Sequence, residues 1–172
     1  MQTVLHDAPV RQSPDWHFLR QHPAYWMAFG FGSGLSPVAP GTMGSLLAFP
    51  LYYAITLAHL TPFWLLMVLL AAQIAGVWVC DVTGRALGEA DYGGIVWDEI
   101  AACWLILASI PQQWAWWLAA FVLFRLFDIW KPWPIRQADR HVKRGLGVML
   151  DDVLAAVYVI LILRGAMMIA AL

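Results

Sequence analysis

The sequence predicts an all-α membrane protein, a polytopic helical bundle of about five spans with an N-terminal interfacial helix. Of its 172 residues, 62% are hydrophobic and only 12% are charged, whereas a soluble domain usually has about 25% charged residues. No Asp, Glu, Lys or Arg occurs between Arg20 and Asp81, an interval long enough for two spans of roughly 20 apolar residues each. The alternative is a soluble helical domain with an unusually apolar core.

The N-terminal elements are expected to lie outside the bundle. Residues 1–14 are polar, lack the apolar core of a cleaved signal peptide and are expected to form a flexible tail. A helix is expected to start at Ser13, with the serine as its cap and a proline in its first turn. The aromatic-rich residues 16–29 are expected to lie along the membrane interface. Glycines and prolines then interrupt the helical pattern over residues 30–44.

Five apolar segments follow and are predicted to span the membrane. Pro132 and Pro134 end the fourth of them, because proline cannot donate to the helix ladder. No repeat or long linker divides the chain, so residues 1–172 are expected to form one membrane-embedded domain. The predicted spans are about residues 45–59, 61–80, 95–110, 114–130 and 148–172.

The basic residues predict the orientation of these spans. The turns at residues 59–62 and 111–113 contain no Lys or Arg, whereas the alternate loops do. By the positive-inside rule the basic loops are cytoplasmic, which places the N-terminus inside. The basic residues on that side are Arg11, Arg20, Arg85, Lys131, Arg136, Arg140, Lys143 and Arg144.

The net charge argues against nucleic-acid binding, and the cysteine content argues against a fold that depends on disulfides. The net charge is −1, which predicts no nucleic-acid partner. Cys80 and Cys103 both fall in apolar stretches and form neither a disulfide framework nor a metal pattern.

Paired acids fall at the predicted cytoplasmic ends of two spans. Asp98 and Glu99 lie in the first turn or so of the third span, and Asp151 and Asp152 in the first turn of the fifth. Either pair alone could simply favour the helix dipole, which stabilises negative charge near a helix N-terminus.

A fifth acid, Asp128, has no such explanation. It lies in the last turn of the fourth span, where the dipole disfavours a negative charge. Arg125 and Lys131 lie three residues before and after it, on the same helix face. The alternative of a salt-bridge ladder explains the two cations but leaves the acid unexplained, and acids near the membrane usually need a partner.

Together these carboxylates predict a divalent-cation site of the phosphoryl-transfer type. Mutual repulsion of the acids requires neutralisation, and oxygen-only ligands favour Mg²⁺, Mn²⁺ or Ca²⁺. Nearby cations would suit a bound phosphate, and a metal beside such cations suits phosphoryl hydrolysis. The predicted metal ligands are Asp98, Glu99, Asp128 and Asp152; the catalytic set adds Lys131 and Asp151, and Arg125 and Arg136 are predicted to bind substrate.

The loop before the first span could also bind an anion. The sequence FGSGLSPVAPGTMGS, starting at Phe31, has small residues that let backbone N–H groups approach a phosphate. It lacks the Gly-Lys-Ser/Thr ending of a Walker loop. The alternative is a turn that packs helices closely. The polar side chains predicted to bind substrate here are Ser33, Ser36, Thr42 and Ser45.

Three blocks of sequence resemble the phosphatidylglycerophosphatase A family. They are FGSGLSPVAPGTMGS from Phe31, IVWDE from Ile95, and FRLFDIWKPWPI from Phe124 with GVMLDD from Gly147; residues 81–92 have no match. The resemblance implies hydrolysis of phosphatidylglycerophosphate to phosphatidylglycerol and phosphate in phospholipid biosynthesis. It also implies Mg²⁺ as cofactor and a multi-pass protein of the bacterial inner membrane, with its site at the cytoplasmic face.

The alternative function is a transporter or ion pathway built around a buried carboxylate cluster. Such proteins often contain internal repeats with broken helices in corresponding positions, and this sequence has no such repeat.

Overall fold

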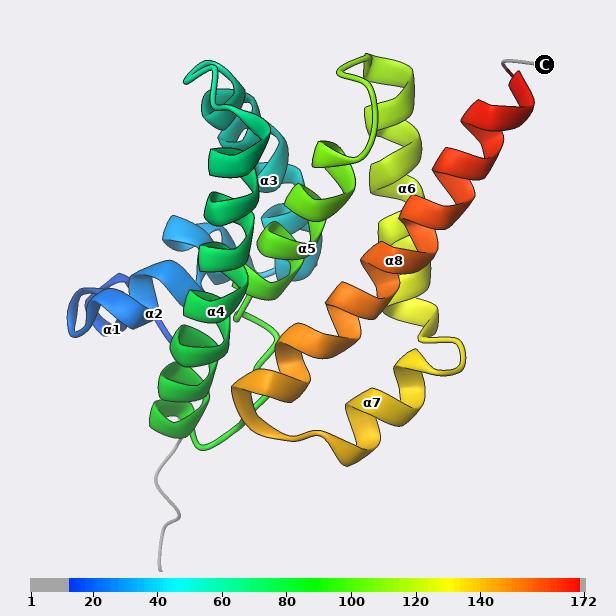
Figure 1. The fold of residues 1–172 in the computed structure, drawn as a ribbon. Helices are drawn as coiled ribbons and strands as arrows, with labels where there is room; N and C mark the ends of the chain where they lie inside the picture. Colours follow the sequence, from blue (N-terminus) through cyan, green and yellow to red (C-terminus); the bar gives the residue numbers. More distant parts are fainter. Residues whose placement is uncertain (1–12, 171–172) are drawn as a thin grey trace, which may run out of the picture.

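The computed structural model describes residues 13–170, and throughout them the regular secondary structure is helical. This confirms the all-α part of the predicted fold class; the predicted tail lies outside the described residues except for Ser13 and Pro14. The elements in Figure 1 are α1 (Trp16–Arg20), α2 (Pro23–Ala28), the 3₁₀ helix η1 (Gly30–Leu35), α3 (Pro40–Thr56), α4 (Pro62–Leu87), α5 (Trp97–Ala108), α6 (Trp114–Trp130), α7 (Ile135–His141) and α8 (Arg144–Ala170).

Helix α5 is the centre of the bundle and packs against α3, α4, α6 and α8 (Figure 1). Ten of its 12 residues are buried, which explains why its sequence is apolar on every side instead of amphipathic. Any polar side chain at the start of α5 is therefore carried into the interior of the protein.

Three side-chain hydrogen bonds fasten α5 to its neighbours. Trp97 Nε1 donates to the Ala72 carbonyl at 3.1 Å, and Gln73 Nε2 donates to the Ala101 carbonyl at 3.0 Å, so both join α5 to α4. Trp104 Nε1 donates to a carbonyl of α3 at 3.0 Å. Interhelical bonds of this kind contribute about 0.6 kcal/mol each in membrane proteins, so they fix the position of α5 more than they stabilise the fold.

Two helices, α4 and α8, are long and apolar enough to cross a membrane. Their outer surfaces also expose large apolar side chains, among them Phe63 and Ile74 of α4 and Leu161 and Ile169 of α8. Two helices of this length and composition, with large apolar side chains exposed on each, support membrane association. The other three predicted spans form helices of 17, 12 and 17 residues.

Because of the directions of the helices, the helix ends that carry the acidic and basic residues lie at the same end of the bundle. Helices α3, α5 and α8 run one way and α4 and α6 the other, so the start of α8, the end of α6 and α7 lie at the lower end in Figure 1. Helix α4 continues past the end predicted near residue 80 and stops at Leu87, where Gly88 adopts a left-handed conformation with φ 71°. A glycine there closes the helix without the strain of a side chain.

The N-terminal region forms two short helices instead of one. Pro23 starts α2, and the His22 side chain caps it by accepting a hydrogen bond from the Ala24 N–H at 3.0 Å. The cap of α1 is Asp15, whose Oδ1 accepts from the Phe18 N–H at 2.9 Å, so the expectation of a Ser13 cap was wrong. A carboxylate satisfies the free N–H groups of a helix start as well as a hydroxyl does.

Candidate active site

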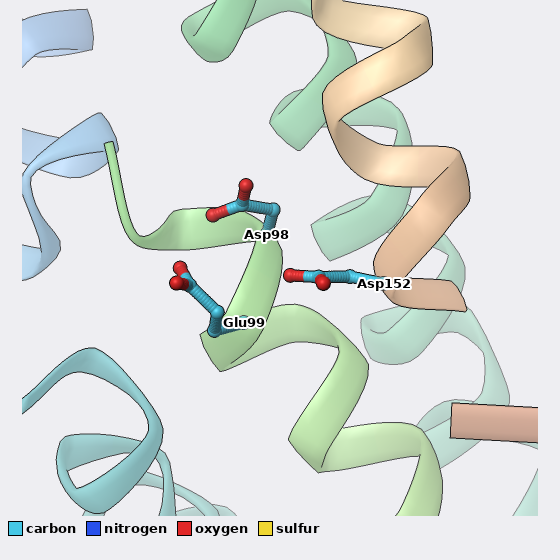
Figure 2. A group of neighbouring side chains, drawn as sticks. All are labelled: Asp98, Glu99 and Asp152. Atoms are coloured by element: carbon cyan, nitrogen blue, oxygen red, sulfur yellow. The ribbon is translucent and has the colours of Figure 1, made fainter. Parts of the chain in front are cut away.

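Three buried carboxylates from two helices meet in the interior. Asp98 and Glu99 occupy the first turn of α5, and Asp152 reaches them from α8 (Figure 2). One oxygen from each carboxylate lies within 4.8 Å of the others. Their exposed fractions are only 6%, 9% and 3%, so water does little to screen their mutual repulsion.

A cavity of about 420 Å³, here called the acid cavity, surrounds this group. Its wall includes the six residues predicted to be catalytic, although they come from three helices and one loop. They are Asp98, Glu99, Asp128, Lys131, Asp151 and Asp152. The structure thus brings together residues that the sequence places more than 50 positions apart.

Close helix packing explains why Asp151 and Asp152 reach α5. Helix α8 begins at Arg144, so these acids lie about two turns into the helix and not in its first turn, as the sequence suggested. A Cβ at Gly145 would overlap the backbone of α4 near Val77. Glycine therefore lets α8 approach α4 closely, and the following turns of α8 are directed against α5.

The glycine-rich loop closes another side of the cavity. Gly41, in the first turn of α3, lies on the cavity wall, and a Cβ there would overlap the Glu99 carboxylate and lie against the Arg125 guanidinium. A Cβ at Gly44 would meet Val96, the residue before α5. Gly41 and Gly44 therefore permit close packing over the acids, as the packing alternative expects. Anion binding by this loop stays a prediction.

Arg125 forms ion pairs with two of the acids. Its Nη1 lies 2.5 Å from Asp128 Oδ2 and 3.6 Å from Glu99 Oε1. The same nitrogen donates to Ser45 Oγ at 3.5 Å. Arg125 thus joins α6 to α5 and α3, and it compensates the charge that the α6 dipole disfavours at Asp128.

Lys131 forms the second cationic contact of the cavity. It follows the last residue of α6 in a left-handed conformation, with φ 45°, and its ammonium lies 2.5 Å from Asp151 Oδ2 and 3.2 Å from Asp139 Oδ1. Partial burial alone would lower the pKa of Lys131, but its hydrogen bonds and ion pairs with these two acids raise it above the ordinary value. The ammonium therefore remains charged at physiological pH.

Several carboxylate oxygens have no hydrogen-bond partner. Asp98 Oδ1, Glu99 Oε2 and Asp151 Oδ1 are all buried and unsatisfied within the described part of the chain. A buried oxygen of this kind is costly unless something binds it. A set of carboxylate oxygens without nitrogen or sulfur suits a hard divalent cation such as Mg²⁺, so these residues fit the cofactor that the sequence suggested.

The hydroxyl groups predicted to bind substrate are turned toward their own backbone. Ser33 donates to the Gly30 carbonyl at 2.9 Å, Ser36 to Val38 at 2.8 Å, and Ser45 to Gly41 at 2.8 Å. Neither these residues nor Thr42, which is partly buried in α3, lie on the wall of the acid cavity. Arg136 also lies elsewhere, in a separate groove on α7.

The structure adds Asp91 to the acids of the cavity. It lies in the loop between α4 and α5, is exposed, and lines the cavity wall. It belongs to the segment that matched no family block, and a single acid in a loop has no periodic pattern that would mark it.

A model of the family described as Phosphatidylglycerophosphatase A matches residues 26–167, which include every acid of the cavity. This chain belongs to the phosphatidylglycerophosphatase A family. The match confirms the resemblance seen in the three sequence blocks, and it extends across residues 81–92, which those blocks left out.

Curated relatives agree with the family match. Phosphatidylglycerophosphatase A of Escherichia coli (strain K12) is 46% identical over 151 residues, covering 86% of this chain and 81% of its own length. The protein of the same name from Haemophilus influenzae is 44% identical over 142 residues, covering 82% and 86%. A relative from Bacteroides thetaiotaomicron, provisionally named a phosphatidylinositol-3-phosphatase, is 44% identical over 137 residues, covering 75% and 84%. No solved structure matches the chain.

Proposed function

We propose that this protein hydrolyses the terminal phosphate of phosphatidylglycerophosphate, releasing phosphatidylglycerol and inorganic phosphate in phospholipid biosynthesis. Membership of the phosphatidylglycerophosphatase A family supports the reaction and substrate. The structural observation that carries the proposal is the acid cavity, in which buried carboxylates lie beside the cations of Arg125 and Lys131. The alternative of a transporter is not favoured by the family match.

Mg²⁺ is the proposed cofactor, and Asp98, Glu99 and Asp152 are the residues that would hold it. Asp128 is a further proposed ligand, through the carboxylate that Arg125 positions. Bound there, Mg²⁺ would neutralise the carboxylates and polarise the phosphate as a Lewis acid. The unsatisfied oxygens of Asp98 and Glu99 support this assignment.

The side chains of this protein bind the phosphate and orient it. A phosphomonoester carries a charge of about −1.5 to −2 at pH 7, and the carboxylates alone would repel it. Lys131 is the proposed donor to its terminal oxygens, and its contact with Asp151 and its place on the cavity wall support this role. Arg125 keeps Asp128 and Glu99 in position through its two ion pairs.

Hydrolysis also requires a proton acceptor in the cavity. Water forms a bond to phosphorus, the bond between phosphorus and the glycerol oxygen breaks, and that oxygen takes up a proton. Asp91 is the proposed acceptor of the proton that water loses, because it lines the cavity, is exposed and forms no ion pair with any residue in 13–170. An exposed carboxylate can then return the proton to solvent.

The proposed location is the bacterial inner membrane, with α3, α4, α5, α6 and α8 embedded and the acid cavity at the cytoplasmic face. The apolar outer surfaces of α4 and α8 support insertion. The distribution of basic residues supports the orientation, since α7, its flanking loops and the first residue of α8 carry five Lys and Arg residues between positions 131 and 144.

Phosphate release is the deciding assay. Protein purified in detergent is incubated with phosphatidylglycerophosphate, and inorganic phosphate is measured with Mg²⁺, with excess chelator, and after Mg²⁺ is restored. We expect release that stops with chelator and returns with Mg²⁺. Absence of release under every condition would refute the proposed reaction, and full release in chelator would refute only the cofactor.

A further inference from the structure

A second hollow lies beside the acid cavity, between the end of α6 and α7. It has a volume of about 390 Å³ and is lined by residues 130–133 together with Arg136, Gln137 and Arg140. We call it the basic groove. Lys131 lines both the basic groove and the acid cavity, so the two hollows adjoin at this residue.

The groove contains two cations that form no ion pair with an acid among the described residues. Arg136 and Arg140 lie one turn apart on α7, and no carboxylate is among the residues that line the groove. Within residues 13–170, neither arginine forms an ion pair or a side-chain hydrogen bond, in contrast to Lys131, which contacts two acids. Uncompensated arginines that line the same groove suit a phosphate, to which arginine can donate two parallel hydrogen bonds.

The substrate of the proposed function carries a second phosphate, and the acid cavity is poorly suited to bind it. Both cations on the cavity wall, Arg125 and Lys131, already form ion pairs with acids. Its head group has a terminal phosphomonoester, then a three-carbon glycerol, then a phosphodiester attached to the lipid. The phosphodiester keeps its negative charge throughout the reaction. A site for it must therefore lie within the reach of one glycerol unit from the acid cavity.

Charge distinguishes the basic groove from another hollow that adjoins the acid cavity. The other hollow, of about 460 Å³, shares Pro40 and Gly93 with the cavity but has no Lys or Arg on its wall. Only the basic groove, of these two, offers cations. It also carries two tryptophans, Trp130 and Trp133, that are 67% and 72% exposed, and tryptophan favours the level of lipid head groups.

The loop after α6, which carries Trp133 and follows Trp130, is held in place. Tyr158 of α8 donates through its hydroxyl to the Trp133 carbonyl at 2.7 Å, and its ring lies 5.3 Å from the Phe127 ring. Lys131, at the other end of the loop, is fixed by Asp151. The groove is thus anchored at both ends to α8, the helix that also supplies two acids of the cavity.

We propose that the basic groove is a subsite for the internal phosphodiester of the substrate, bound by Arg136 and Arg140 while the terminal phosphate occupies the acid cavity. This inference rests on the proposed function. It assigns Arg136 to the second phosphate, and not to the phosphate beside the acids. It also makes Arg140 a specificity residue, because a lipid with a single phosphate would leave the groove empty.

The test compares steady-state kinetics of the wild-type protein, Arg136→Ala, Arg140→Ala and the double variant in neutral detergent. Two inhibitors probe the two sites: short-chain phosphatidylglycerol, which keeps only the phosphodiester, and inorganic phosphate, which suits the acid cavity. Losing these charge-assisted contacts should raise KM for phosphatidylglycerophosphate about tenfold in the double variant and weaken inhibition by phosphatidylglycerol by a similar factor. Both kcat and inhibition by phosphate should stay unchanged.

Lys143→Ala is the matched control, because it removes a positive charge from the same segment without lining the groove. We expect it to behave as wild type. Equal losses in Lys143→Ala and the arginine variants would show that only surface charge matters, and unchanged inhibition by phosphatidylglycerol would also overturn the proposal. If the wild-type protein releases no phosphate, the proposed function fails, while thermal melting with short-chain phosphatidylglycerol still tests the subsite directly.

Discussion

The ammonium of Lys131 lies 2.5 Å from Asp151 Oδ2, although 20 residues separate the two in sequence. This contact joins the loop after α6 to α8 and places a fixed positive charge on the wall of the acid cavity. Asp151 depends on this lysine, because without it a carboxylate would be left uncompensated in a largely buried position, whereas Lys131 also contacts Asp139.

Replacing Lys131 should therefore affect turnover and stability differently. Lys131→Ala removes a proposed phosphate contact of ~3 kcal/mol in the transition state, so turnover should fall about a hundredfold. It also leaves Asp151 without its cation, which should lower the melting temperature. Adding Asp151→Asn should restore the melting temperature but not turnover. Near-normal turnover of Lys131→Ala would show that this lysine does not bind the phosphate.

Mg²⁺ binding can be measured without turnover. Saturating Mg²⁺ should raise the melting temperature, since a ligand present at ~100 times its Kd stabilises the folded protein by about 2.7 kcal/mol. Asp152→Asn and Asp128→Asn should reduce this shift and abolish turnover. Asp139→Asn, which alters an acid outside the cavity wall, is the control and should keep the shift. Asp128→Asn could have a lower melting temperature than wild type and yet show the full increase on adding Mg²⁺. Asp128 would then serve only as the ion-pair partner of Arg125.

Gly41→Ala tests the close approach of the glycine-rich loop. The added methyl group would overlap the Glu99 carboxylate and crowd Arg125, and overpacking of this kind typically costs about 1–3 kcal/mol. We expect a lower melting temperature and at least a tenfold loss of turnover. Gly165→Ala is the matched control, because a Cβ there meets no atom within 4 Å; equal behaviour of the two variants would contradict the packing argument.

Asp91→Asn tests the proposed proton acceptor. General acid–base catalysis typically contributes about 10²- to 10⁴-fold, so kcat should fall by at least a hundredfold while KM changes little. The melting temperature should not change, since the side chain is exposed and unpaired among the described residues. Glu89→Gln, in the same loop but off the wall of the acid cavity, is the control. Wild-type kcat in Asp91→Asn would remove this residue from the mechanism.

The proposed orientation is open to cysteine labelling in intact cells and in vesicles of opposite orientation. A membrane-impermeant thiol reagent added outside should label Gln112→Cys and not Arg140→Cys. The native Cys80 and Cys103 are buried, so they should contribute little background. The reverse labelling pattern would show that the protein has the opposite orientation in the membrane, with the acid cavity on the outer face.

The sequence was sufficient for the parts of the fold that follow a simple pattern. The bounds of α6 agree with the prediction, because prolines and a polar turn mark its two ends. The convergence of the acids on α5 and α8 also followed, since each pair lies toward the same end of its helix. The ion pair of Arg125 with Asp128 reflects their separation of three residues on one helix.

Other features depended on tertiary contacts that no local pattern encodes. The start of α8 was placed too late because Gly145 and Gly147 usually weaken a helix, whereas Gly145 is needed here for packing on α4. Arg136 was grouped with the acids on sequence proximity to Lys131, but α7 directs it into another groove. Asp91 could not be recognised, because its place on the cavity wall depends on how an irregular loop folds back.

The loop after α6 is attached to α8 at two points, so its position is coupled to the position of α8. Tyr158 holds the Trp133 carbonyl and Asp151 holds Lys131, so a change in the tilt of α8 would move the acid cavity and the basic groove in concert. Helices long enough to span a bilayer adjust their tilt to its hydrocarbon thickness. Turnover in bilayers of graded acyl-chain length should then pass through a maximum, and Tyr158→Phe, which frees one attachment, should flatten it. The composition of the membrane would in this way regulate an enzyme that helps to make it.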